Sequence, residues 1–520
     1  MKTFFVETYG CQMNLADSET VGGILSNAGY RRAEALEQAD VIFVNTCAIR
    51  ERAEERVLGR LSELARLKHQ KPDLVLGVLG CMAQHIKTKI TSRIPAVDIV
   101  AGPDGYRALP RLIAERNDEP YLEVELSKTE TYADVHPLRE SGIRAWVSIM
   151  RGCDKFCTFC IVPYVRGRER SLPMADILNQ LEKLAAEGYK EVVFLGQTVN
   201  AYKDPSTPTA VARVACPSRS SDSARGFGPA KGGAVTRETS NAAMSGSSKP
   251  LTPEDGIPKR RNAFAALLKK AAEVDGIERI RFTSPHPVDF DWETIEALAE
   301  NPKICPQLHL PLQSASNPVL LKMKRRYTLE YYDQLLSAFR KAVPDLAVST
   351  DIIVGFPGET EADFQATYDY LARTRYDSAF LFKYSPRPGT KSYEWGDPLT
   401  EEEKLRRLQA VIDLQEKISF EKNQTWIGKT VEVLAEGPSK KSKSPGNGVS
   451  PVPPTKGDAR PDLSGRTGGQ SGNTIWFGKS PQFKTVVFKP SGKINPGDKI
   501  SIPISRATSH TLFGADMGEK

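Results

Sequence analysis

A chain of 520 residues is too long for one hydrophobic core, so we expect two to four domains. With 40% hydrophobic and 26% charged residues it has the composition of a soluble globular protein, and a formal charge of +7 is compatible with an RNA partner. The absence of a long apolar run or a signal peptide argues against a membrane or secreted protein and predicts a cytoplasmic one.

The first hundred residues repeat one pattern three times. A strand-like apolar run is followed each time by a cysteine and then by a segment with helical periodicity; the runs are KTFFVETYG, ADVIFVNT and DLVLGVLG. This alternation predicts a parallel sheet with both faces covered, over residues 1–125. Because ligands bind beyond the carboxyl ends of such strands, Cys11, Cys47 and Cys81 should meet at one edge.

These three strand-end cysteines have two interpretations. Each could be an ordinary buried thiol, which is a common fate for cysteine. Three thiols in equivalent positions instead favour a shared iron–sulfur site. The eight cysteines of the chain are not spaced like a secreted disulfide framework, which also favours metal binding.

A second group of cysteines opens the central region, residues 139–375. Cys153, Cys157 and Cys160 form a Cys-x3-Cys-x2-Cys triplet. Three thiolates this close can bind three irons of a 4Fe-4S cluster and leave the fourth open for chemistry. The alternatives are a structural zinc knuckle or chance clustering. No nearby His or fourth Cys completes a tetrahedral zinc set, since the closest candidates are His136 and the distant Cys216.

Strand-like and helix-like segments alternate through the central region. The predicted strands lie in AWVSIMRG, EVVFLGQT, ERIRFTS, QLHLPLQS, LAVSTDIIVGFPGE and SAFLFKYSPRPGT. This repeat, with the triplet after its first strand, predicts a partial (β/α)6 barrel whose strand-end loops carry the chemistry. Residues 376–426 are expected to form a linker and a helix.

The C-terminal region differs from the rest of the chain in its predicted secondary structure. Short β-rich pieces separated by glycine, proline and polar turns predict a small antiparallel barrel over residues 427–510, a shape that often binds nucleic acid. Residues 204–258 and 438–473 are rich in small and polar residues and poor in large apolar ones. They predict two disordered insertions.

The motifs around both cysteine groups resemble the methylthiotransferase family of radical S-adenosylmethionine (SAM) enzymes. They are YGCQMNLADSE, NTCAIRERAEERV, LGCMAQ, RGCDKFCTFCIVPYVRGRERS, HLPLQS, DIIVGFPGET and YSPRPGT. The sequence GCQMN resembles the MiaB-type branch, which adds a methylthio group to C2 of N6-isopentenyladenosine beside the tRNA anticodon. The tail resembles the tRNA-binding TRAM domain of the family.

The resemblance implies two 4Fe-4S clusters and SAM as cofactors. The triplet would hold the cluster that cleaves SAM, and Cys11, Cys47 and Cys81 would hold an auxiliary cluster whose open iron carries the sulfur to be transferred. The substrate would be tRNA and the reductant a flavodoxin- or ferredoxin-type protein. A monomer is expected, and the sulfur donor is left open.

Some further residues are candidates for contacts with SAM. Phe159 would pack near its adenine or serve as a core aromatic. Gly196 and Gln197 end a strand that could line the SAM pocket. Gly355 and Gly358 belong to a tight turn that could let the backbone approach the cofactor, or that could be a plain turn.

Five further side chains are candidates for contacts with the nucleic acid. His309 and Gln313 alternate along a predicted strand and would face the substrate or the core. Arg166, Arg168 and Arg170 would bind RNA phosphate or cover the rim of the barrel.

Two alternatives to this function remain. Sister branches of the family methylthiolate threonylcarbamoyl-adenosine in tRNA or an aspartate of a ribosomal protein. A non-catalytic iron–sulfur protein that binds RNA would keep the scaffold and lose the reaction. Loss of a cluster thiol would be its expected sign, and all six are present.

Overall fold

The computed structural model describes residues 1–520 except 48–50, 118, 140–141, 208–250, 440–473 and 516–520. Most of both predicted insertions lies outside the described residues. The predicted segment 204–258 is nevertheless too long at its C-terminal end, because Leu251 pairs with Tyr327 and a short helix, η5 (Pro253–Asp255), follows. In the part of the chain that is described, no helix is long and apolar enough to cross a membrane.

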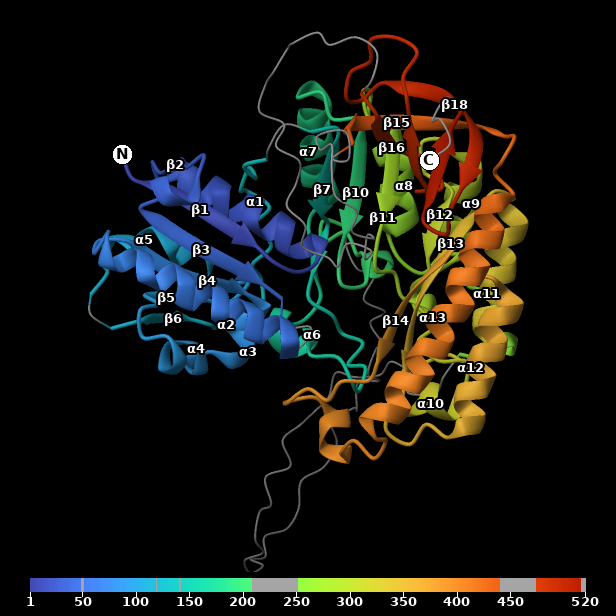
Figure 1. The fold of residues 1–520 in the computed structure, drawn as a ribbon, viewed down its shortest axis with the longest axis horizontal. Coiled ribbons are helices and arrows are strands. Elements are labelled where there is room, and N and C mark those ends of the chain that lie inside the picture. The colour runs from blue at the N-terminus through green and yellow to red at the C-terminus, as the bar shows by residue number, and fades with distance from the viewer. Residues whose placement is uncertain (48–50, 118, 140–141, 208–250, 440–473, 516–520) are drawn as a thin grey trace, which may run out of the picture.

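The N-terminal domain is the predicted parallel sheet with helices on both faces (Figure 1). Alternate side chains of the central strands point to opposite sides, so that α1 and α5 pack on one face and α2, α3 and α4 on the other. The strands are β1 (Thr3–Thr8), β2 (Arg31–Arg32), β3 (Val41–Thr46), β4 (Val75–Gly80), β5 (Ile99–Ala101) and β6 (Tyr121–Glu123). The helices are α1 (Gln12–Asn27), α2 (Glu51–Ala65), α3 (Cys81–Ile86), α4 (Thr88–Arg93) and α5 (Leu109–Ala114).

The strand order β2-β1-β3-β4-β5-β6 places β1 and β3 side by side in this sheet. The chain leaves β1 toward one face and β3 toward the other, which makes the gap between these neighbours a topological switch point. Cys11 follows β1 and Cys47 follows β3, so the two cysteines flank that gap.

The central region contains all six predicted strands, in two three-stranded parallel sheets ordered β11-β10-β7 and β12-β13-β14. A parallel bridge between Ile280 and Ile304 joins the sheets into the partial barrel. The strands are β7 (Arg144–Ser148), β10 (Glu191–Leu195), β11 (Arg279–Phe282), β12 (Gln307–His309), β13 (Ala347–Val354) and β14 (Ser378–Lys383). Since β14 pairs with β13, the barrel extends past the predicted boundary at residue 375.

Helices with one apolar face cover the outside of the barrel and share its core. They include α7 (Met174–Ala186), α8 (Phe264–Ala272), α9 (Trp292–Glu300), α10 (Asn317–Lys322), α11 (Leu329–Ala342), α12 (Glu361–Thr374) and α13 (Glu401–Gln424). The triplet loop lies between a short antiparallel pair, β8 (Met150–Arg151) and β9 (Arg170–Ser171), and is followed by α6 (Val162–Arg166).

The tail forms a closed barrel in the order β15-β16-β17-β19-β18. Its strands are β15 (Thr430–Pro438), β16 (Trp476–Lys479), β17 (Thr485–Phe488), β18 (Lys499–Ala507) and β19 (Thr511–Gly514). Two details differ from the prediction. The β17–β19 pair that closes the barrel is parallel, and β19 lies beyond the predicted end at residue 510.

The C-terminal barrel packs against the amino ends of the central strands through a buried charge cluster. Glu191, at the start of β10, is fully buried and contacts both Arg144 and Arg281. Arg144 also donates a hydrogen bond to Glu436 in β15 at 2.8 Å, and Arg281 donates one to the carbonyl of Ser480 at 2.8 Å. The Glu191 carboxylate therefore holds two arginines that reach across the domain boundary.

Replacing Glu191 by glutamine is expected to lower the free energy of unfolding by about 3–5 kcal/mol, because two buried guanidiniums lose their counter-charge. Burial raises the pKa of Glu191, but the two arginines outweigh it and the pKa lies below its usual value of about 4.3. The stabilisation is thus present above about pH 4.3 and is lost as the pH falls through the folded-state pKa. Thermal unfolding of the variant and the wild type at pH 7 measures the expected loss of free energy. Glu278→Gln, which removes a partly exposed partner of Lys190 and Lys499, is the control and should cost less than about 1 kcal/mol.

Candidate functional site

The three strand-end cysteines of the N-terminal domain lie together. Cys11 caps the N-terminus of α1, Cys47 directly follows β3, and Cys81 opens α3. Cys47 is within hydrogen-bonding reach of both other thiols. The hydrogen bond with Cys47 lowers the pKa of the Cys11 thiol to about 6, although burial opposes this, and it lowers the pKa of Cys81 as well. The edge predicted from the strand pattern therefore gathers all three sulfurs.

Two glycines allow these thiols to approach one another. Gly10 and Gly80 directly precede the first and third cysteines, and their φ angles are +122° and +90°. A Cβ on Gly10 would lie 2.7 Å from the Cβ of Cys47, and one on Gly80 would lie 2.4 Å from Oδ1 of Asn45. Only glycine fits both the backbone angle and the space.

A buried guanidinium contacts this group of thiols. Arg166 donates from Nε to the Cys81 sulfur at 3.1 Å and from Nη2 to Asp17 at 2.7 Å. Arg151 donates to the other oxygen of Asp17 at 2.9 Å. Sequence reasoning missed Asp17 and Arg151; charges inside the apolar segments of α1 and β8 were the available signal.

The arginines of the VRGRER segment correct an expectation. Arg166 and Arg170 are buried in ion pairs with aspartates, so the prediction that they bind RNA phosphate or cover the rim is wrong. Arg168, whose side chain is 56% exposed, pairs with Asp154 at the surface. Only this one of the three is open to a nucleic acid.

The triplet cysteines lie in the loop after β8, with a second buried arginine beside them. Arg325 donates from Nη1 to the Cys157 sulfur at 3.4 Å. Its other hydrogen-bond partners in the described chain are neutral, namely the Tyr327 hydroxyl and the Pro311 carbonyl. Burial raises the pKa of the Cys160 thiol to about 11. The site thus offers a buried positive charge that only an ionised sulfur or another anion can balance.

The two groups of thiols are connected through α6. This helix begins two residues after Cys160 and ends at Arg166, and Cys81 packs against Ile161 and Val165. In the described part of the chain, no three His, Cys, Asp or Glu side chains are placed to hold a single metal ion. An iron–sulfur cluster does not require this, because its thiolates bind different irons.

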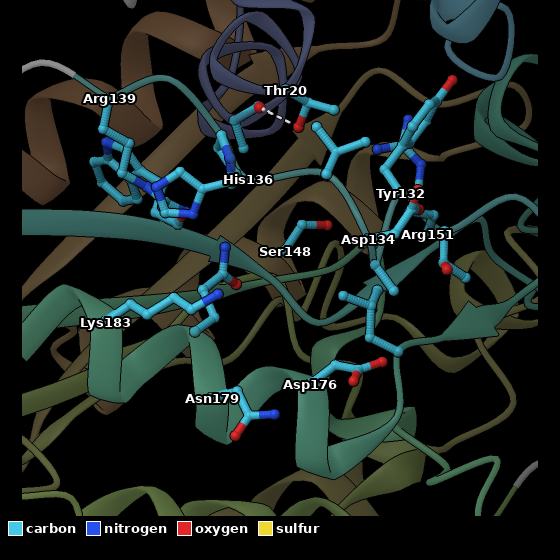
Figure 2. Close-up of a pocket in the computed structure, with 18 residues that line it drawn as sticks. Thr20, Tyr132, Asp134, His136, Arg139, Ser148, Arg151, Asp176, Asn179 and Lys183 are labelled. Atoms are coloured by element: carbon cyan, nitrogen blue, oxygen red, sulfur yellow. Dashed lines mark hydrogen bonds between the residues drawn. The ribbon is translucent and has the colours of Figure 1, made fainter. Parts of the chain in front are cut away.

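A cavity of about 230 Å³ lies apart from both groups of thiols. It is enclosed by α1, the connector 131–139, β7 and α7, and Figure 2 shows Asp176, Asn179 and Lys183 of α7 around it. No cysteine lines this cavity. Arg151 forms part of its wall, and its buried ion pair with Asp17 links the cavity to the Cys81 site.

Comparisons with known proteins agree with this architecture. Residues 3–102 match the model of Uncharacterized protein family UPF0004, and residues 147–228 and 230–371 match the Radical SAM superfamily. The solved structure of the radical SAM methyltransferase TsrM from Kitasatospora setae, with tryptophan and a SAM analogue bound, has a TM-score of 0.50 at 12% identity. The alignment covers 76% of this chain and 75% of TsrM, and it shows a shared fold.

Curated relatives are much closer in sequence. The tRNA-2-methylthio-N(6)-dimethylallyladenosine synthase of Bacteroides thetaiotaomicron is 40% identical over 99% of this chain and 96% of its own length. The synthase of Chloroherpeton thalassium is 40% identical over 98% of this chain and 95% of its own length. The chain belongs to the tRNA-2-methylthio-N(6)-dimethylallyladenosine synthase family. The resemblance drawn from the motifs is confirmed, and the chain is an enzyme.

Membership of the radical SAM superfamily implies a 4Fe-4S cluster and SAM, and the residues beyond β10 and β11 fit such a ligand. Gln197 Oε1 and His286 Nε2 are buried and have no hydrogen-bond partner among the described residues. His286 Nδ1 accepts from the amide of Val288, which leaves the proton on Nε2. An acceptor and a donor are therefore left for a ligand at neighbouring strand ends. His286 was not predicted, although it lies only two residues after the ERIRFTS segment.

The remaining candidates for SAM contacts have partners within the protein. Phe159 packs edge-on against the phenylalanine of the 355–358 turn, with ring centroids 6.3 Å apart. Gly355 and Gly358 have φ angles of +72° and +81°, and a Cβ on Gly355 would lie 2.5 Å from Lys404. A Cβ on Gly196 would also clash, 2.6 Å from a side chain of β8. Tight packing explains these glycines, and their contact with SAM stays a prediction.

The two candidates of the HLPLQS segment are likewise partnered within the barrel. His309 contacts Ser349 through Nδ1 at 3.0 Å and Asp351 through Nε2 at 3.4 Å. Gln313 has a φ of +73°, and its backbone N–H donates a hydrogen bond to the backbone carbonyl of Asp351 at 2.8 Å. These contacts hold both residues against β13, and a substrate contact stays a prediction.

Proposed function

We propose that this chain methylthiolates C2 of N6-isopentenyladenosine beside the anticodon of tRNA, giving 2-methylthio-N6-isopentenyladenosine. The relatives that share 40% of its sequence are named for this product, in which dimethylallyl is another name for isopentenyl. The observation that carries the proposal is the pair of three-thiol sites joined through α6. Action on threonylcarbamoyl-adenosine or on a ribosomal aspartate would need the same two sites, and the names of the relatives do not favour it.

In this proposal Cys153, Cys157 and Cys160 hold the cluster that binds SAM. When bound, this pair of cofactors supplies one-electron chemistry, which is required because the adenine C2–H bond is not acidic enough for general-base catalysis. Arg325 supplies a buried positive charge to Cys157. His286 donates a hydrogen bond from its Nε2–H group to the bound ligand. The barrel wall excludes water from these contacts.

The second part of the proposal is the auxiliary cluster, held by Cys11, Cys47 and Cys81. Three adjoining sulfurs, the two glycines that permit their approach and the Arg166 donor support it. The C-terminal barrel is proposed to hold tRNA, as small closed β barrels often do. A flavodoxin- or ferredoxin-type protein would supply electrons to the enzyme, which is proposed to act as a monomer in the cytoplasm.

Anaerobically reconstituted protein is expected to contain about eight irons and eight sulfides per chain, because each 4Fe-4S cluster holds four of each. Nucleosides from tRNA of a deletion strain, analysed by mass spectrometry, should lack 2-methylthio-N6-isopentenyladenosine and accumulate the isopentenyl precursor. A count of about four irons would refute the second cluster. An unchanged nucleoside profile would refute the substrate.

A further inference from the structure

A buried network of charges adjoins Cys81, and the proposed reaction does not by itself explain it. Three guanidiniums contact two carboxylates, and none of these side chains is more than 5% exposed; the network consists of Asp17, Asp104, Arg151, Arg166 and Arg170. One positive charge is therefore not balanced by a carboxylate of the network. Arg166 is the member of the network that contacts a thiol.

Arg166 has donors left for a bound group. Its Nε reaches the Cys81 sulfur and its Nη2 reaches Asp17, but its Nη1 is buried without a hydrogen-bond partner among the described residues. A buried N–H of a guanidinium is costly to leave unpaired. An anionic group held by the three thiols would satisfy both this donor and the remaining charge.

We propose that Arg166 is a positioning residue that orients Cys81 and raises the reduction potential of the auxiliary cluster, and that Asp17 limits this effect. The proposal rests on the proposed function, since it requires that cluster. Reduction adds one negative charge to the cluster, and a nearby positive charge with hydrogen bonds to sulfur stabilises the reduced state in a buried site. Asp17 fixes the guanidinium with a charge-assisted hydrogen bond and offsets part of its charge.

The test is a redox titration of full-length reconstituted protein, followed by electron paramagnetic resonance. Addition of SAM identifies the signal of the triplet cluster, and the other signal is followed. In Arg166→Gln the ratio of reduced to oxidised auxiliary cluster at a fixed potential should fall about tenfold, which corresponds to about 59 mV for one electron. In Asp17→Asn the ratio should rise, and Arg166→Lys should recover part of the wild-type value.

Opposite shifts in the two variants distinguish an electrostatic role from loss of structure, which would not reverse its sign. Arg168→Gln is the matched control, because this arginine lies two residues away at the surface and should leave the potential unchanged. If Arg166→Gln does not load the cluster, Asp17→Asn and Arg166→Lys decide the question. Two clusters with unmoved potentials would overturn this inference alone, whereas a wild type with about four irons would overturn the auxiliary site itself.

Discussion

Replacing Cys157 by alanine is expected to reduce SAM cleavage to the level of cluster-free protein and to abolish methylthiolation. Cys157 is the middle thiol of the triplet and accepts the hydrogen bond of Arg325. Its loss removes one of the three proposed ligands and leaves a buried guanidinium without a sulfur to balance it. The measurement is the yield of 5′-deoxyadenosine after addition of dithionite and SAM under anaerobic conditions.

The matched control for this variant is Cys305→Ala. Cys305 is a buried thiol of the barrel that belongs to neither group of ligands. The control should retain about eight irons and produce 5′-deoxyadenosine. If Cys157→Ala still cleaves SAM while folding normally, the triplet does not hold the cluster that binds SAM.

Replacing Cys47 by alanine should separate the two halves of the reaction. We expect the iron content to fall from about eight to about four, SAM cleavage to persist at least in part, and methylthiolated tRNA to disappear. Cys47 interacts with both other thiols of its group, so its removal leaves two of the three sulfurs proposed to hold the auxiliary cluster. The triplet lies in a different domain and keeps its own three thiols.

Two products are measured on the same sample, 5′-deoxyadenosine and the methylthiolated nucleoside. Methylthiolated tRNA from the Cys47 variant would contradict the role of the auxiliary site. Loss of SAM cleavage to background would show instead that the two sites cannot be uncoupled, as a defect in the α6 contact would predict.

Much of the fold was predictable because apolar runs and helical periodicity alternate clearly along the chain. The three strands before Cys11, Cys47 and Cys81 and the six strands of the barrel are where the pattern predicts them. Boundaries were less predictable. Strand β19 is only four residues long, and its place is set by pairing with β17 and β18, which the local sequence does not contain.

The charged residues show the limit of sequence reasoning most clearly. Arg166, Arg168 and Arg170 alternate along one short segment, and nothing in their spacing separates the exposed member from the two buried ones. The partners that bury them, Asp17 and Asp104, are supplied by the other domain. An ion pair between domains depends on packing, and sequence patterns do not report it.

The sequence by itself determined the two groups of three cysteines, the strand ends that carry them and the family to which they point, because cysteine spacing and hydrophobic periodicity are local properties. Only the tertiary structure decided that α6 joins the two groups, that Arg166 and Arg325 each donate to one sulfur, and that His286 leaves a buried donor at the end of β11. These contacts join residues far apart in the chain. They depend on how the domains pack, because a charge or donor buried in a low-dielectric interior needs a partner, and the local sequence does not contain that partner.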